Sequence, residues 1–150
     1  MVTPSQSQDL LSTVRQSRSS GAALRREAMS LLSDLPGYNW SGIYRLEGET
    51  LVLDEYVGAN TDHTRISVGV GVCGTAVAQD KNQVVDDVRE LTNYLACSTQ
   101  TRSEIVVLIR SAAGEVLGQI DIDGHEVGAF GGSDEAMLEE LGSLLAERWL

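Results

Sequence analysis

Two cysteines are the residues of this sequence best suited to chemistry. Cys73 lies in a Gly-Val-Cys-Gly segment at 71–74, and Cys97 ends a Tyr-Leu-Ala-Cys segment at 94–97. A thiol at a turn into a helix sits where backbone N–H groups and the helix dipole favour the thiolate, which is the reactive form. Both cysteines are therefore candidates for nucleophilic or redox chemistry. The simpler interpretation is that each is a small, buried apolar residue.

Three acidic residues could assist such a thiol. Glu104 opens an apolar segment, and Asp121 and Asp123 lie two residues apart in another, so the two aspartates project to one face of a strand. Asp is disfavoured in strands, which makes this pair unusual, whereas a Glu at a strand end is ordinarily just solvated. If the acids converge, crowding of like charges should raise the pKa of at least one of them.

Aromatic residues could form the wall of a pocket around these groups. Trp40 and Tyr44 lie four apart in one predicted strand and face the same side, either as core residues or as an apolar wall with the Tyr44 hydroxyl as a donor. Tyr94 either closes the pocket or lies on the surface. The pair at 125–126, His then Glu, has no spacing suited to metal ligation with other His or Cys residues. We expect no metal site and no cofactor.

The composition narrows the class of protein. The 150 residues suffice for one domain, and 42% hydrophobic with 22% charged residues is typical of a soluble globular protein. A formal net charge of -11 repels phosphate backbones and anionic membranes, so we expect neither nucleic acid nor membrane as a partner. The N-terminus lacks a basic region followed by an apolar stretch, and we expect a cytoplasmic protein. Two cysteines do not make a disulfide framework.

Hydrophobic periodicity predicts the elements that must position these residues. The predicted helices are 8–35, kinked or divided near Ser19-Ser20-Gly21, then 73–79, and 133–149 with Ser133 as its N-cap. The predicted strands are 40–46, 51–57, 83–85, 105–110 and 115–123. The first two and the last two strands should form hairpins, and 86–100 should be an irregular crossing segment. This order predicts an α+β fold in which helices pack on an antiparallel sheet.

Six segments occur in an order that resembles the GAF-domain free methionine-(R)-sulfoxide reductases. The segments are 38–44, 71–76, 84–88, 94–97, 103–106 and 118–123, and together they extend over almost the entire chain. The resemblance implies one GAF domain over 1–150, with 1–8 disordered. It also implies a GAF/PAS-like central antiparallel β-sheet flanked by N- and C-terminal helices. Because some GAF domains only bind small molecules, the fold alone does not establish an enzyme.

The resemblance also implies roles for individual residues. Cys97 is the thiol that attacks free methionine-(R)-sulfoxide and becomes a sulfenic acid, and Cys73 condenses with it to a disulfide. Thioredoxin or another dithiol then reopens the disulfide. The acids hold the substrate ammonium, and one of them in protonated form serves the sulfoxide oxygen. The implied catalytic residues are Cys97, Cys73, Glu104 and Asp123, and the implied substrate-binding residues are Trp40, Tyr44, Tyr94, Glu104, Asp121 and Asp123.

One position departs from the family. Its reductases usually carry a third cysteine shortly before the Gly-Val-Cys-Gly segment, and that position falls on His63 here. Three outcomes follow: Cys73 resolves the sulfenic acid, a small thiol reduces it directly, or turnover is lost. His63 itself is a proton carrier, a cation near thiolate, or a solvated loop residue. The rival function is a non-catalytic GAF module that binds a small ligand and signals through its terminal helices as a homodimer.

Overall fold

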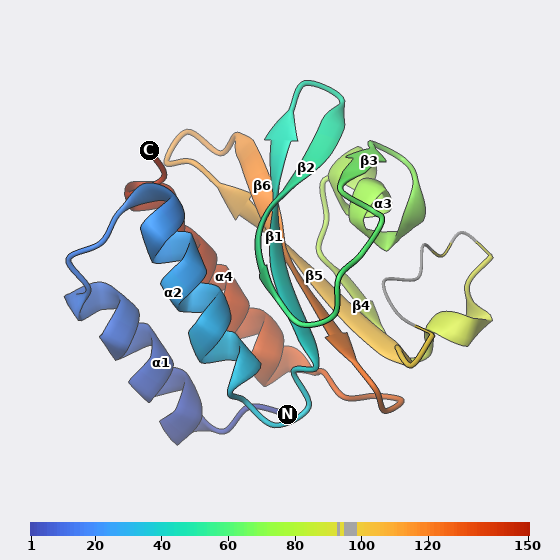
Figure 1. Cartoon of the computed structure of the whole chain (residues 1–150), viewed down its shortest axis with the longest axis horizontal. Helices are drawn as coiled ribbons and strands as arrows, with labels where there is room; N and C mark the ends of the chain where they lie inside the picture. The colour runs from blue at the N-terminus through green and yellow to red at the C-terminus, as the bar shows by residue number, and fades with distance from the viewer. Residues whose placement is uncertain (93, 95–98) are drawn as a thin grey trace.

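A computed structural model of the chain describes residues 1–92, 94 and 99–150 (Figure 1). Within these residues, six strands form one antiparallel sheet in the order β3-β2-β1-β6-β5-β4. The strands are β1 Trp40–Glu47, β2 Thr50–Val57, β3 Arg65–Ser67, β4 Gln83–Val85, β5 Ser103–Arg110 and β6 Val116–Gly124. The helices are α1 Pro4–Gln16, α2 Gly21–Ser33, α3 Gly71–Gln79 and α4 Gly132–Glu147, with the short 3₁₀ helix η1 Val88–Glu90. The predicted α+β class is confirmed.

The N-terminal helical segment is two helices, and it starts earlier than predicted. Residues 1–8 were expected to be disordered, but α1 begins at Pro4. Thr3 and Gln6 form a capping box, in which each side chain accepts a hydrogen bond from the backbone N–H of the other. Proline at the first helical position adds to this signal, because its fixed φ suits a helix start. The local chemistry of the first six residues therefore outweighs their low hydrophobicity.

The start of α4 also differs from the prediction. Ser133 lies inside the helix, and the N-cap is Gly131. The side chain that satisfies this end is Asp134, which accepts the Gly131 N–H at 2.9 Å. Asp134 also accepts the Tyr38 hydroxyl at 2.6 Å and the Val2 N–H at 3.0 Å. The tertiary partners of Asp134 thus decide where α4 begins.

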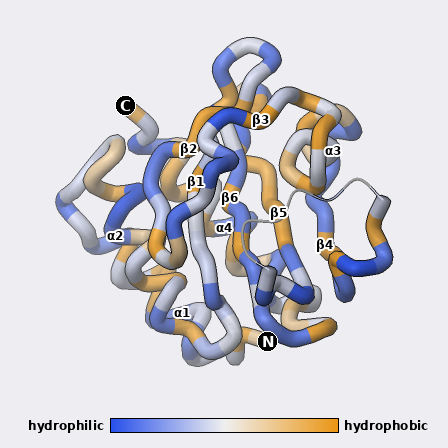
Figure 2. Tube along the Cα trace, turned by 45° about the vertical axis from the view of Figure 1, so that its right-hand side comes forward, coloured by the Kyte–Doolittle hydropathy of each residue, from blue (hydrophilic) through white to orange (hydrophobic). Residues whose placement is uncertain are grey.

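The two faces of the sheet are covered differently (Figure 1). Helices α1, α2 and α4 cover one face, here called the helix face, while α3 packs on the other, here called the site face. Alternation along β5 and β6 sends Ile105, Val107, Ile120 and Ile122 into the core on the helix face. Their neighbours in sequence must then project to the site face. Figure 2 shows the apolar colouring of β5 where it crosses the middle of the molecule.

Both predicted hairpins are confirmed, β1 with β2 and β5 with β6. The pairing of β1 with β6 joins segments far apart in the chain, with Trp40 opposite Asp123 and Gly42 opposite Asp121. Strand β3 was not predicted: Arg65–Ser67 has one β-branched residue between two polar ones, whereas the equally short Gln83–Val85 has two. None of the described helices combines the length and the apolar character needed to cross a bilayer.

Candidate functional site

The Gly-Val-Cys-Gly segment forms the first turn of α3 and places Cys73 against the sheet. Gly71 has φ +66°, a conformation that side-chain-bearing residues rarely adopt. A Cβ on Gly74 would come within 2.5 Å of the Ser67 carbonyl oxygen, so the helix could not approach the preceding turn so closely with any other residue. The two glycines therefore hold α3 tightly against β3. Cys73 is buried as a result, with 5% exposure.

The three acids reach the site face through strand alternation and register. Glu104 on β5 lies opposite Asp123 on β6, and Asp121 lies two pairs further along, opposite Val106. All three side chains are buried, with exposures of 3% for Glu104, 0% for Asp121 and 1% for Asp123. The predicted common face of the two aspartates is thus present. Glu104, predicted as a strand opener, is the second residue of β5 and is not a solvated end.

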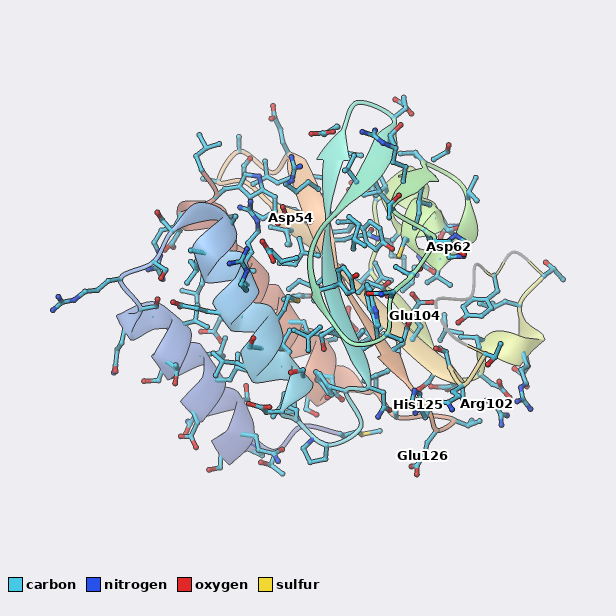
Figure 3. The ribbon with its side chains drawn as sticks, viewed as in Figure 1. Asp54, Asp62, Arg102, Glu104, His125 and Glu126 are labelled. Carbon is cyan, nitrogen blue, oxygen red and sulfur yellow. The ribbon has the colours of Figure 1, made fainter. Side chains whose placement is uncertain are left out.

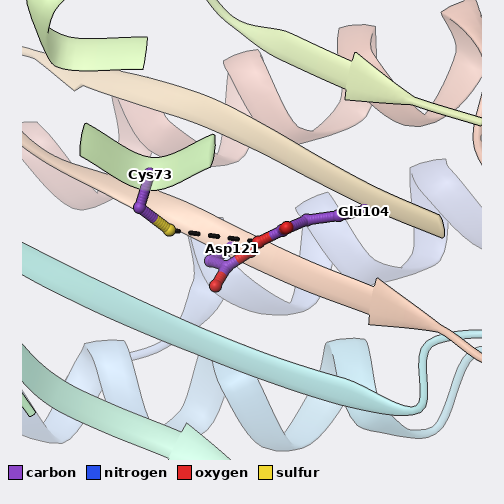
Figure 4. A group of neighbouring side chains, drawn as sticks. All are labelled: Cys73, Glu104 and Asp121. Carbon is purple, nitrogen blue, oxygen red and sulfur yellow. Dashed lines mark hydrogen bonds between the residues drawn. The ribbon is translucent and has the colours of Figure 1, made fainter. Parts of the chain in front are cut away.

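Cys73, Glu104 and Asp121 form a compact cluster (Figure 4). The Cys73 Sγ lies 4.0 Å from Glu104 Oε2, and one ligand atom from each of the three residues lies within 4.8 Å of the others. Figure 4 shows the thiol pointing from α3 toward the two carboxyl groups on β5 and β6. Asp123 lies outside this cluster. The arrangement joins a soft sulfur donor to two carboxyl groups in a buried place.

Burial controls the charge state of the central acid. Removal from water raises the pKa of Asp121, while the polar side chains of Glu104 and Cys73 beside it act in the opposite direction. The predicted direction of the shift is therefore found at Asp121. Its cause is different, because desolvation rather than repulsion between carboxylates is the main contribution.

A narrow cavity opens beside the cluster and has a volume of about 10 Å³, which is room for about one water molecule. Its described lining is His63, Ile66, Val70, Gly71, Val72, Cys73, Glu104 and Asp121. The apolar residues from β3 and the start of α3 were not predicted, because nothing in the sequence places them opposite the acids. A larger polar groove between the α3–β4 turn and α4 contains none of the candidate site residues. The cluster, not the larger groove, combines thiol and acid chemistry.

The aromatic residues pack around the site without lining this cavity. Trp40 is buried, stacks on Tyr56 with ring centroids 5.6 Å apart, and donates from Nε1 to the Ala59 carbonyl oxygen. Tyr44 is fully buried, and its hydroxyl donates to the His63 carbonyl oxygen at 2.8 Å. This bond ties the His63 loop to the middle of β1. Tyr94 packs against the same apolar cluster as Trp40 and Tyr44.

Cys97, the predicted attacking thiol, lies outside the described residues. His125 and Glu126 are exposed in the loop after β6 and are separated from Glu104 (Figure 3). Among the described residues, the set that could ligate a cation is instead Cys73, Glu104 and Asp121. Spacing along the chain could not have shown this set, because each member comes from a different element.

Comparison with known proteins agrees with this architecture. The sequence profile of the GAF domain family matches residues 11–147. The free methionine-R-sulfoxide reductase of Escherichia coli (strain K12) is 38% identical over 120 residues, which are 80% of this chain and 72% of that protein.

Two solved structures extend the likeness to three dimensions. The type II free methionine-R-sulfoxide reductase from Thermoplasma acidophilum has a TM-score of 0.81 at 38% identity, with 94% of this chain and 95% of that chain covered. The free methionine-R-sulfoxide reductase from Neisseria meningitidis, solved in complex with its substrate, has a TM-score of 0.87 at 30% identity, covering 99% and 92%. The likeness therefore extends over the elements that carry the cluster.

Proposed function

The chain belongs to the GAF-domain family of free methionine-R-sulfoxide reductases, and from this premise we propose that it reduces free methionine-R-sulfoxide to methionine. The observation that carries the proposal is the buried cluster of Cys73, Glu104 and Asp121 at a cavity on the site face. It supplies the acid groups that sulfoxide reduction by a thiol needs. The relatives named above carry the substrate assignment.

The acids favour a free amino acid as substrate. No lysine or arginine is among the described residues that line the cavity, where Glu104 and Asp121 lie close to each other. The positively charged ammonium group of free methionine sulfoxide would bind to Glu104, Asp121 and Asp123. A peptide-bound residue has an uncharged amide at this position and brings extra backbone.

In the proposed chemical step, Cys97 attacks the substrate. Its thiolate attacks the sulfoxide sulfur while the oxygen takes up one proton, which a carboxyl group of the cluster would supply. The oxygen passes to Cys97, so the substrate sulfur is reduced by two electrons and the cysteine is oxidised to a sulfenic acid. Methionine leaves. Trp40, Tyr44 and Tyr94 would form the apolar surroundings of the S-methyl group.

In the proposed mechanism, Cys73 takes part in returning Cys97 to its thiol form. Its thiol attacks the sulfenic acid, water leaves, and the resulting disulfide is reduced by thioredoxin or another dithiol. The place of Cys73 in the same cavity as the acids supports this assignment. Direct reduction of the sulfenic acid by a small thiol is the alternative, since His63 occupies the position of the usual third cysteine.

The test is turnover of free methionine sulfoxide resolved by epimer, driven by thioredoxin or by dithiothreitol. We expect consumption of the R epimer alone, and a loss of at least about a thousandfold in Cys97→Ser, because a serine hydroxyl is a far weaker nucleophile at neutral pH. Cys73→Ser is the matched control: it should keep the first turnover and accumulate a trappable sulfenic acid. Near wild-type turnover by Cys97→Ser would refute the assignment of the nucleophile.

Substrate selectivity gives a second test. We expect free methionine-R-sulfoxide to be preferred over its N-acetyl derivative by at least about tenfold in kcat/KM, since acetylation removes the ammonium charge. Equal turnover of both compounds would remove the proposed role of the acids. Binding of the free sulfoxide without turnover of either epimer in any thiol would instead favour the non-catalytic binding module.

A further inference from the structure

We infer that Tyr44 is a positioning residue of this site, because its hydroxyl holds His63 over the cavity and so controls the entry of substrate. Tyr44 is fully buried in the middle of β1, and its hydroxyl donates to the His63 carbonyl oxygen at 2.8 Å. His63 lines the cavity together with Cys73, Glu104 and Asp121. The identity of the substrate rests on the proposed function, whereas the hold of Tyr44 on His63 does not.

The cavity is too small for the substrate while its lining stays in place. Its volume of about 10 Å³ is room for about one water molecule. Pockets that enclose small-molecule ligands have volumes of roughly 300–1,000 Å³. Free methionine sulfoxide is a whole amino acid, so it enters only if part of the lining moves.

Most of the described lining belongs to fixed parts of the fold. Glu104 and Asp121 lie on β5 and β6, which are interior strands of the sheet, and other lining residues lie in β3 and α3. Val70, in the turn before α3, is bonded through its backbone on both sides. Its N–H donates to the Ser67 carbonyl oxygen at 3.0 Å, and its own carbonyl oxygen accepts the Gly74 N–H at 2.9 Å. Movement of these residues would break strand pairing or the first turn of a helix.

His63 is held in a different way. It lies in the loop 58–64 between β2 and β3, outside the helices and strands (Figure 1). Its carbonyl oxygen accepts the Tyr44 hydroxyl, and its N–H donates to Thr61 Oγ1 at 3.1 Å. Such bonds to side-chain hydroxyls can break without disturbing a helix or a β-ladder. His63 is therefore the part of the described lining best placed to move aside.

The start of the same loop is anchored away from the cavity. Trp40 Nε1 donates to the Ala59 carbonyl oxygen at 2.9 Å, and the Tyr56 hydroxyl donates to Asn60 Oδ1 at 2.9 Å. Neither Ala59 nor Asn60 is among the described residues that line the cavity. Opening can therefore be confined to the part of the loop that the Tyr44 hydroxyl holds.

The first experiment measures amide exchange in the reduced protein without substrate, residue by residue, by NMR. Tyr44→Phe keeps the buried ring and removes the bond to His63, so the N–H groups of His63 and Thr64 should exchange at least about fivefold faster. Exchange in β5 and β6 should stay unchanged, which verifies that the variant is folded. Unchanged exchange at His63 and Thr64 would overturn the inference.

Tyr56→Phe is the matched control. It removes the same atom from another tyrosine that bonds to the same loop, but its partner Asn60 does not line the cavity. The exchange of the His63 N–H should therefore equal that of the wild type. Faster exchange at His63 in Tyr56→Phe, equal to that in Tyr44→Phe, would overturn the assignment of the hold to Tyr44.

The second experiment is the kinetics of reduction of free methionine-R-sulfoxide. Tyr44→Phe should raise KM by at least about fivefold and keep kcat within about twofold, because the hydroxyl encloses the substrate and takes no part in the chemical step. Tyr56→Phe should keep both constants. An unchanged KM in Tyr44→Phe would overturn the inference, whether or not kcat falls. If the wild type lacks reductase activity while exchange at His63 responds as expected, only the proposed function fails.

Discussion

Two buried aspartates on opposite faces of the sheet meet very different surroundings. Asp134 and Asp121 both have 0% exposure. Asp134 accepts three hydrogen bonds, from Val2, Tyr38 and Gly131. Asp121 instead has a thiol, Cys73, and another carboxyl group, Glu104, as its described hydrogen-bonding neighbours. A carboxylate with three donors from separate elements joins parts of the fold, whereas a carboxyl group that faces an acid and a thiol at a cavity is placed to meet a ligand.

The helix face and the site face of the sheet differ in the same way as the two aspartates. On the helix face, apolar side chains from α1, α2 and α4 fill the space against the sheet. On the site face, the strand positions that alternate with this core carry Glu104, Asp121 and Asp123. Burying such groups costs stability, and proteins commonly accept that cost where activity requires it. The following predictions test this division, from the largest expected effect on stability to the smallest.

Asp134→Ala should destabilise the fold by about 3 kcal/mol, because it leaves one hydroxyl and two backbone N–H groups without their acceptor. Chemical denaturation of wild type and variant measures the difference. The remaining folded protein should keep its affinity for free methionine sulfoxide, since Asp134 is not part of the cavity lining. A loss below about 0.5 kcal/mol would show that Asp134 does not hold the helix face together.

Tyr38→Phe should cost about 1 kcal/mol at neutral pH, through loss of one buried hydrogen bond to a carboxylate. Burial, and then the bond to Asp134, raise the pKa of Tyr38 far above its usual range. The folded protein therefore keeps the phenol neutral where the unfolded chain ionises, above a pH of about 10. This part of the stability is present below that pH and is lost as the pH rises.

The measurement for Tyr38 is the free energy of unfolding against pH for both proteins. The wild type should lose stability more steeply than Tyr38→Phe above a pH of about 10, so the gap between them narrows. Parallel curves through this range would contradict the expected ionisation of the unfolded chain.

Asp121→Asn should have the opposite sign, with a gain of about 1 kcal/mol at neutral pH and a loss of activity. Burial raises the pKa of Asp121 and so favours its neutral form in the folded protein. Its contribution to stability is therefore present at low pH and lost as the pH rises through the unfolded value. The gain in Asp121→Asn should shrink as the pH falls, which thermal unfolding at several pH values will show.

The activity of Asp121→Asn completes the comparison. A loss of at least about tenfold in kcat/KM together with higher stability would mark Asp121 as a residue kept for function. Destabilisation by Asp121→Asn at neutral pH would mean that the carboxylate has a structural role like that of Asp134.

The sequence by itself determined most of the elements and the common face of Asp121 and Asp123. Period-two alternation and turn glycines are local signals, so both hairpins and the strand at 83–85 could be predicted. The capping box of Thr3 and Gln6 was equally local. The early start of α1 is therefore encoded in the first six residues themselves.

Only the tertiary structure decided which of these residues meet. The register of β5 on β6 and the close approach of α3 at Gly74 bring Cys73 within reach of Glu104 and Asp121. Tertiary packing also brings the β3 part of the cavity lining to the cluster. It likewise makes Asp134, rather than Ser133, the side chain that accepts a hydrogen bond at the start of α4. These contacts join residues up to 132 positions apart. Local propensity contains no information on such distances, because packing and pairing between separate elements determine them.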